Sequence, residues 1–423
     1  MNIQELAKLI NAEYLARYRN VKVSRFETNT KNLKKSDVFI AINSGHNYLK
    51  DIKICKAIIV SNDYQNEKIP VLKVKDTKEA LKKIAAYKRL KYKGKIIAIT
   101  GSNGKTTTKE LLSHILKQKY SVYKTYKNTN NTIGVPLNLL ALDDSKIAVL
   151  ELGMNHPGEI SELSKLVKPD IAIITNIGTA HIGNFGSQKK IYESKMEILD
   201  GMSSKNLFVN GNDTYLKNNK DAIKIYLKND LFEIKNIKSF SDYLIFDLKI
   251  DKTYSVKFNI PSTIQLTNVA LAIYVALFLE VKPEKIVKAL SSFKSIENRL
   301  EIIKMKDKII LNDSYNSNFE SLMAGLETLN NYSLDKICII GSILELGGKE
   351  KEIYKKISIN LNNNYEYIFV GNKIKAKNAL YFEDVYELIN YYHDNKDKFR
   401  NKVIYVKGSN GVKLIEFIKQ LTA

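Results

Sequence analysis

The sequence predicts a three-domain α/β protein, with a small N-terminal α/β domain, a central parallel-sheet domain and a C-terminal Rossmann-like α/β domain. The chain has 423 residues, which exceeds the size of one ordinary domain. Short apolar runs alternate with helical patterns, as in parallel sheets with crossover helices. Several of these runs end on Gly, Asp or Asn, at the strand ends where open sheets bind ligands.

The N-terminal domain is expected over residues 1–92. Residues 1–18 (MNIQELAKLINAEYLARY) have an amphipathic helical pattern without the apolar core of a signal peptide. The runs DVFIAI, AIIVS and VLKV predict short strands. A lysine-rich helical stretch over residues 77–95 ends the domain and could bridge to the next one.

The central domain is expected over residues 93–294 and the C-terminal domain over residues 295–423. The longest apolar run, Val269 to Val281, predicts a buried helix, because a membrane span needs about 20 residues. In the C-terminal domain, KIILNDS, KICIIGS, YIFVGN and KVIYVKGS predict four strands of a second open sheet.

The composition is typical of a soluble globular protein, with 44% hydrophobic and 26% charged residues. The net charge of +22 suits an anionic small substrate. The lysines are spread along the chain and form no basic block, so nucleic acid is not an expected partner. Cys55 and Cys338 stand far apart in apolar surroundings, which favours a reducing cytoplasm and no disulfide. A monomer is expected.

A phosphate-binding loop is predicted in the stretch IIAITGSNGKTTTKELLSHIL. Gly101 and Gly104 would let the backbone approach phosphate oxygens, and the following helix N-terminus supplies amide donors. Lys105 would reach the β- and γ-phosphates, and Thr106 would bind Mg²⁺. The order strand, Gly, GKT and amphipathic helix favours a nucleotide over a Thr-capped glycine turn. However, Ile99 stands where the usual P-loop has its first glycine.

Three polar residues that follow in the central domain could complete this site. Glu151 ends the run KIAVLE and would bind Mg²⁺ directly or through water, although alone it would indicate a capping or salt-bridged acid. His181 follows a strand within a glycine-rich loop, which favours a ligand or substrate contact over a structural role. Lys195 lies on a predicted helix beside Glu193 and Glu197, which taken alone indicates a surface lysine with charge partners.

Polar residues also gather around the first strand expected in the C-terminal domain. Arg299 could reach the γ-phosphate and stabilise the charge of phosphoryl transfer. Asp313 could hold ribose hydroxyls. Either residue could equally form a salt bridge at a domain interface. Tyr315, Asn316 and Asn318 follow in the same segment, NDSYNSN.

Taken together, these residues resemble the Mur ligase family, whose members use ATP to form amide bonds in bacterial cell-wall synthesis. The loop TGSNGKTT is similar to this family's own shorter phosphate loop, which accounts for Ile99. Ala180 stands where the tripeptide-forming and folate branches of the family usually have Asp. Further family motifs occur in the family's order over nearly the whole chain: NTNNTIGVPLNLL, ELGMNHPGEI, TNIGTAHIGNFGS, ESKMEIL, NDSYNSN, ILELGG and VKGSNG.

The resemblance implies an ATP-dependent ligase that adds D-alanyl-D-alanine to UDP-N-acetylmuramoyl-tripeptide through an acyl phosphate. This is the last cytoplasmic peptide-adding step of peptidoglycan precursor synthesis. The resemblance also makes the first domain a UDP-binding domain and the central domain a P-loop-type ATPase domain. The implied cofactors are ATP and Mg²⁺, together with a carbamylated lysine. Carbamylation would turn an ammonium, which repels Mg²⁺, into a carboxylate that binds it.

The same resemblance assigns roles to individual residues. Catalytic roles are expected for Lys105, His181, Lys195 and Arg299. Magnesium ligands are expected at Thr106, Glu151, His181 and Lys195 as its carbamate. Contacts to ATP are expected from Gly101, Ser102, Asn103, Gly104, Lys105, Thr106, Thr107, Asn268, Arg299 and Asp313. Substrate contacts are expected from Ser24, Arg25, Asn130, Asn131, Tyr315, Asn316 and Asn318.

The chain departs from the family pattern at several positions. Asn312 replaces the first residue of a usual Asp pair, and Asn410 replaces an Arg. Ile264 and Gln265 replace a usual His-Asn pair, and the short first domain has Ser44 in place of an Asp. These changes affect the expected adenine and nucleotide-sugar contacts more than the phosphate site.

Three rival functions follow from the same residues. A glutamate-adding folate ligase such as folylpolyglutamate synthase would act on folates. A P-loop ATPase stimulated by nucleic acid would use the positive charge, although clustered basic and aromatic patches are missing. A catalytically weakened scaffold would fit Asn312 and Asn410. However, four retained residues argue for activity: Lys105, Glu151, His181 and Lys195.

Overall fold

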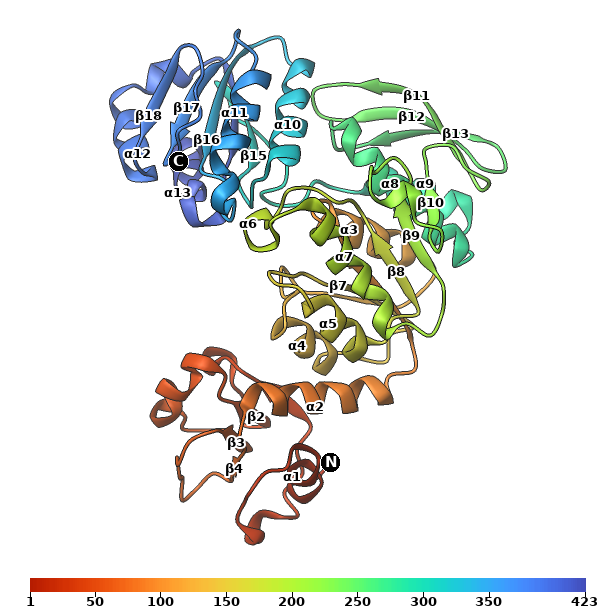
Figure 1. Ribbon diagram of the computed structural model, residues 1–423, viewed down its shortest axis with the longest axis vertical. Helices are drawn as coiled ribbons and strands as arrows, with labels where there is room; N and C mark the ends of the chain where they lie inside the picture. The colour runs from red at the N-terminus through yellow and green to blue at the C-terminus, as the bar shows by residue number, and fades with distance from the viewer.

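The computed structural model describes all residues from 1 to 423 and contains four β-sheets. The N-terminal region lies at one end of an elongated molecule, the C-terminal sheet lies at the other, and the central sheet lies between them (Figure 1). The predicted α/β class with three domains is therefore confirmed.

The N-terminal region is built on a parallel sheet in the order β1-β2-β3-β4. Its strands are β1 (Arg25–Glu27), β2 (Asp37–Ile40), β3 (Ala57–Val60) and β4 (Val71–Lys73). The three predicted strands are confirmed, whereas β1 was missed because its sequence, Arg-Phe-Glu, has one apolar residue between two charged ones and forms no apolar run. The helix expected over residues 1–18 is wrong in length. Helix α1 spans Ile3–Ile10, because Asn11 adopts the left-handed conformation and ends it.

Helix α2 (Thr77–Lys91) connects this region to the central sheet, as its position in the sequence suggested. Its Lys82 forms an ion pair with Glu162 at 2.5 Å. Arg89 Nε donates to the carbonyl oxygen of Val167 at 2.6 Å. Both partners lie in helix α5 (Glu159–Val167) of the central region, so α2 is attached to both parts of the molecule.

The central sheet is parallel throughout, in the order β10-β9-β8-β5-β7-β6. The strands are β5 (Lys95–Thr100), β6 (Val122–Lys124), β7 (Ile147–Glu151), β8 (Ile171–Ile174), β9 (Leu207–Asn210) and β10 (Ile223–Ile225). The helices are α3 (Lys105–Leu116), α4 (Gly134–Leu140), α5, α6 (Ile182–Phe185), α7 (Gln188–Met196), α8 (Leu266–Phe278) and α9 (Pro283–Ser292). Because β5 lies between β7 and β8, the loop that follows it is flanked by the carboxyl ends of both neighbours.

Helix α8 confirms the buried helix predicted from the longest apolar run, since most of its side chains are inaccessible to solvent. None of the helices is long and apolar enough to cross a membrane. A small antiparallel sheet precedes α8, with β11 (Glu233–Ser239), β12 (Leu244–Lys249) and β13 (Thr253–Phe258). This sheet is not among the predicted elements, although β12 alternates buried and less buried side chains as a half-buried strand should.

The C-terminal sheet has the order β14-β15-β19-β16-β17-β18, in which only β14 is antiparallel to its neighbour. The strands are β14 (Glu301–Lys304), β15 (Lys308–Asp313), β16 (Asp335–Gly341), β17 (Glu366–Val370), β18 (Ala379–Phe382) and β19 (Lys402–Lys407). The helices are α10 (Phe319–Thr328), α11 (Glu350–Asn360), α12 (Val385–Asp394) and α13 (Leu414–Thr422). The four predicted strands are confirmed as β15, β16, β17 and β19.

Candidate functional site

The loop between β5 and α3 has a conformation that requires glycine at both ends. Gly101 has φ of 149°, and a Cβ atom there would lie 1.8 Å from Thr175 Oγ1. Gly104 has φ of 77°, and a Cβ atom there would lie 2.5 Å from Asn268 Oδ1. Thr175 Oγ1 also donates to the carbonyl oxygen of Asn103 at 2.5 Å. The loop is thus held from two sides in a fixed shape.

The first turn of α3 presents a set of free donors beside this loop. The backbone amides of Gly104, Lys105, Thr106 and Thr107 have no acceptor within the protein. Lys105 Nζ folds back onto the carbonyl oxygen of Gly101 at 2.7 Å, and burial lowers the pKa of this lysine. Free amides and a cation at the positive end of a helix suit a chain of phosphates.

Glu151 faces the same turn from the end of β7. Its Oε2 accepts a hydrogen bond from Thr106 Oγ1 at 2.9 Å, and its Oε1 accepts one from Asn130 Nδ2 at 2.8 Å. The residue is 2% exposed. A carboxylate and a hydroxyl at the phosphate end of a P-loop are the oxygen donors that Mg²⁺ prefers.

A larger metal cluster is not present, because no three His, Cys, Asp or Glu side chains are grouped so that they could hold an ion. A magnesium site of this kind does not need such a group, since Mg²⁺ binds to one or two protein oxygens and completes its shell with phosphates and water. Thr106 and Glu151 therefore fit Mg²⁺ bound together with a nucleotide.

Lys195, on α7, is 3% exposed, and its side-chain ammonium forms no hydrogen bond or ion pair. The alternative in which it is a surface lysine paired with Glu193 or Glu197 is therefore wrong. Burial, and then repulsion by Lys105, lowers the pKa of Lys195 well below its ordinary value. Glu197 instead accepts the backbone amides at the start of α5.

His181 lies at the contact with the C-terminal domain. Its Nδ1 is 2.5 Å from Glu345 Oε2, although the angles are not those of a hydrogen bond. This contact lowers the pKa of the Glu345 carboxyl. Two backbones meet nearby, because a Cβ atom on Gly183 would lie 2.6 Å from the carbonyl oxygen of Glu345, and one on Gly347 would lie 2.9 Å from Gly183 Cα. No hydrogen bond joins His181 to Thr106 or Glu151.

The C-terminal domain also places an arginine at the first turn of α3. Arg299 Nη2 donates to Thr106 Oγ1 at 2.9 Å. Its guanidinium lies 4.0 Å from the centre of the Tyr315 ring, which supports it from one side. The geometry brings Arg299 to the end of the loop where a phosphate chain would lie.

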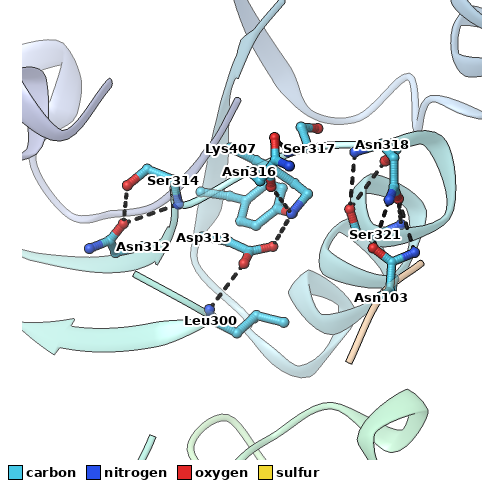
Figure 2. A network of polar contacts seen from close by, with 12 residues as sticks. Asn103, Leu300, Asn312, Asp313, Ser314, Asn316, Ser317, Asn318, Ser321 and Lys407 are labelled. Carbon is cyan, nitrogen blue, oxygen red and sulfur yellow. Dashed lines mark hydrogen bonds and ion pairs between the residues drawn. The ribbon is translucent and has the colours of Figure 1, made fainter. Parts of the chain in front are cut away.

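Two side chains near the start of α10 hold the C-terminal domain against the loops of the central domain. The amides of Asn103 and Asn318 donate to each other, at 2.7 and 3.2 Å (Figure 2). Glu320 accepts from the backbone amide of Thr179 at 3.1 Å and from its hydroxyl at 2.8 Å. These hydrogen bonds join the two domains directly across their interface.

Asp313 is occupied by protein groups in this arrangement. Its Oδ2 accepts from Lys407 Nζ at 2.5 Å, and its Oδ1 accepts from the amide of Leu300 at 3.3 Å (Figure 2). Its Oδ2 also accepts from the Tyr405 hydroxyl at 3.3 Å. Lys407 Nζ also donates to the carbonyl oxygen of Asn316 at 3.1 Å. The carboxylate makes an ion pair inside the C-terminal domain instead of facing the loop.

The remaining expected residues lie in two places. Asn268 borders the glycine loop, whereas Asn131 accepts the amides of Ile133 and Gly134 and so shapes a turn. Ser24 and Arg25 lie in the N-terminal region, where Arg25 Nε is 3.4 Å from Asp37. Sequence reasoning missed Glu320 and Lys407. Lys407 ends the run KVIYVK at a strand end and could have been found, whereas a helical acid such as Glu320 carries no signal.

Comparison with known proteins gives a consistent result. Residues 99–276 match the Mur ligase middle domain. A UDP-N-acetylmuramoyl-tripeptide--D-alanyl-D-alanine ligase from Rickettsia prowazekii is 34% identical, over 94% of this chain and 95% of the relative. The ligase of the same name from Bacillus subtilis is 31% identical, over 99% and 97%.

Solved structures agree with these relatives. A MurF crystal structure from Acinetobacter baumannii has a TM-score of 0.90 at 27% identity and covers 99% of this chain and 98% of its own. A MurF ligase from Thermotoga maritima in complex with ADP has a TM-score of 0.83 at 27% identity, over 94% and 96%. The similarity therefore extends over all three domains.

Proposed function

Since the chain belongs to the Mur ligase family, we propose that it is the ATP-dependent ligase that joins D-alanyl-D-alanine to UDP-N-acetylmuramoyl-tripeptide. The observation that carries the proposal is full-length similarity, at 34% and 31% identity, to two relatives named for this reaction. The glycine loop with its free amides supports the use of ATP. The reaction belongs to peptidoglycan precursor synthesis.

The geometry of the site suggests a separate role for each residue in phosphate binding, magnesium binding and phosphoryl transfer. The amides of Gly104–Thr107 and the ammonium of Lys105 would bind the phosphate chain. Thr106 and Glu151 would hold Mg²⁺, which supplies neutralisation of phosphate charge when bound. Arg299 would stabilise the charge that develops as the tripeptide carboxylate attacks the γ-phosphate, displacing ADP and giving an acyl phosphate. The dipeptide amine would then attack the acyl phosphate and displace inorganic phosphate.

A carbamate on Lys195 is part of this proposal. Its support is the burial of this lysine without any counter-charge, near the like-charged Lys105. A neutral amine is the form that reacts with carbon dioxide, and burial favours that form. The resulting carbamate would be an anion that could bind Mg²⁺ or pair with the ammonium of Lys105.

The test is phosphate release from ATP and Mg²⁺ with UDP-N-acetylmuramoyl-tripeptide and D-alanyl-D-alanine, added singly and together. Release should require both substrates, and the product should be heavier than the tripeptide by the dipeptide less water. Acceptors with each of the two types of diamino acid at the third peptide position are assayed, because the identity of that residue is not predicted from the sequence. Release that ignores both substrates would contradict the proposal, and folate with glutamate would be the next pair to assay.

A further inference from the structure

The turn that carries Arg299 has an unusual backbone. Asn298 has φ of 59° and Leu300 has φ of 51°, so both neighbours of Arg299 are left-handed. Asn tolerates this conformation, but a bulky residue such as Leu rarely adopts it. A strained turn of this kind persists only where its surroundings hold it in place.

Side chains of the following hairpin hold the turn. Glu301 Oε2 accepts from the amide of Asn298 at 3.0 Å. Asn312 Nδ2 donates to Asn298 Oδ1 at 2.7 Å and to Glu301 Oε2 at 3.1 Å. The amide of Leu300 donates to Asp313 Oδ1 at 3.3 Å. Each residue of the turn next to Arg299 is therefore bonded to β14 or β15.

The amide group of Asn312 is essential to this arrangement. Asn312 is 2% exposed and lies opposite Glu301 in the antiparallel pair of β14 and β15. Its Oδ1 accepts from the hydroxyl of Ser314 at 2.7 Å and from the Ser314 backbone amide at 3.3 Å (Figure 2). Its Nδ2 therefore faces Glu301. An aspartate has no donor to offer there, and it would place a second carboxylate against Glu301.

We propose that Asn312 and Glu301 form a clamp that positions Arg299 for phosphoryl transfer, and that this clamp requires the amide at position 312. Arg299 touches Thr106 through one nitrogen, and a shift of about 1 Å in the turn is enough to impair such a contact. The proposal rests on the proposed function, because it assigns a positioning role within that reaction.

The test replaces the amide at position 312 by a carboxylate and then supplies an amide at position 301 to compensate. Asn312→Asp should lower kcat at least about tenfold, because a displaced Arg299 would stabilise the transferring phosphoryl group less well. Adding Glu301→Gln should restore most of kcat, because the amide donor then comes from the opposite strand. Asn364→Asp adds the same charge at an exposed site that contacts no other domain, and it should leave activity unchanged.

A second readout separates positioning from simple loss of structure. If Asn312 acts through Arg299, then Asn312→Asp should have no further effect on kcat in an Arg299→Ala background. Asn312→Ala removes the two hydrogen bonds that Nδ2 donates to Asn298 and Glu301, together with those that Oδ1 accepts from Ser314, without adding charge. It should show a smaller loss of kcat, again absent in the Arg299→Ala background. This variant carries the test if the aspartate variant does not fold, as judged by thermal unfolding.

Three results would overturn the clamp: wild-type kcat in the folded Asn312→Asp protein, no recovery with Glu301→Gln, or losses that add to that of Arg299→Ala. A wild-type protein without turnover on both substrates would contradict the proposed function instead. ATP affinity of the same variants would then test the clamp, with weaker binding expected for Asn312→Asp and recovery expected in the double variant.

Discussion

A single buried side chain, Lys195, shows what local sequence can and cannot tell. Its neighbours Glu193 and Glu197 indicate a surface lysine, yet Lys195 lies on the buried face of α7. Glu197 instead accepts a backbone amide at the start of α5. Only the resemblance of the motif ESKMEIL to the family marked it as functional. Burial depends on which helix face packs on the sheet, and residues far along the chain decide that.

Replacing Lys195 by Arg tests the carbamate. Arginine keeps the positive charge but forms no carbamate, so dipeptide-dependent phosphate release should fall by at least about a hundredfold. Lys190→Arg, at an exposed position on the same helix, is the matched control and should keep its activity. An active Lys195→Arg enzyme would contradict the carbamate, as would the absence of a carbamate carbon signal with ¹³C-labelled bicarbonate.

Asp313 illustrates a second limit at this scale. The strand end predicted a polar residue at the sheet edge, and Asp313 lies there. Its partner Lys407 is 94 residues away, on the adjacent strand β19. Strand order decides this pairing, and apolar runs define strands without defining their order.

At the scale of elements, long apolar runs were the most reliable guide. The runs that became β15, β16, β17 and β19 were predictable because buried parallel strands are almost uniformly apolar. The short edge strand β1 and the antiparallel sheet of β11, β12 and β13 were not, since their signals are brief or alternate with charges.

Helix α10 makes a testable contribution to domain closure. Glu320→Ala removes the acceptor for the amide and hydroxyl of Thr179, and for a half-exposed carboxylate these two bonds together contribute on the order of 1 kcal/mol. The closed form should be less populated, so kcat/KM for ATP should fall by about three- to tenfold. Glu327→Ala, at an exposed residue of the same helix, should match the wild type in the same assay.

Equal kinetics for the two α10 variants would contradict this role of Glu320. Thermal unfolding should differ little between them, because Glu320 bonds across the interface and lies outside the core of its own domain. The comparison therefore measures closure separately from stability.

The whole molecule combines a strongly basic charge with a reaction on anions. The net charge of +22 is spread along the chain, which suits long-range attraction of a nucleotide-sugar peptide better than a nucleic-acid groove. The sequence supported the three-domain class and the phosphate loop. It did not define how the domains close, because contacts such as Asn103 with Asn318 join residues 215 positions apart.

Salt should reveal this attraction. Between about 0.05 and 0.5 M NaCl, kcat/KM for UDP-N-acetylmuramoyl-tripeptide should fall several-fold as charges are screened. The KM for the zwitterionic D-alanyl-D-alanine should change little and serves as the internal control. Polynucleotide should not stimulate ATP hydrolysis, and steep stimulation would instead favour the nucleic-acid ATPase.

The meeting of Gly183 with the segment of Glu345 and Gly347 has a mechanical consequence. The two backbones are in direct contact there, because Gly183 and Gly347 have hydrogen atoms in place of side chains. At such a backbone contact no side chain can rotate to accommodate a small displacement of one domain, so the two segments are either in full contact or apart. A single methyl group on Gly183 would collide with the backbone of Glu345 and Gly347, and it would keep the central and C-terminal domains from reaching full contact.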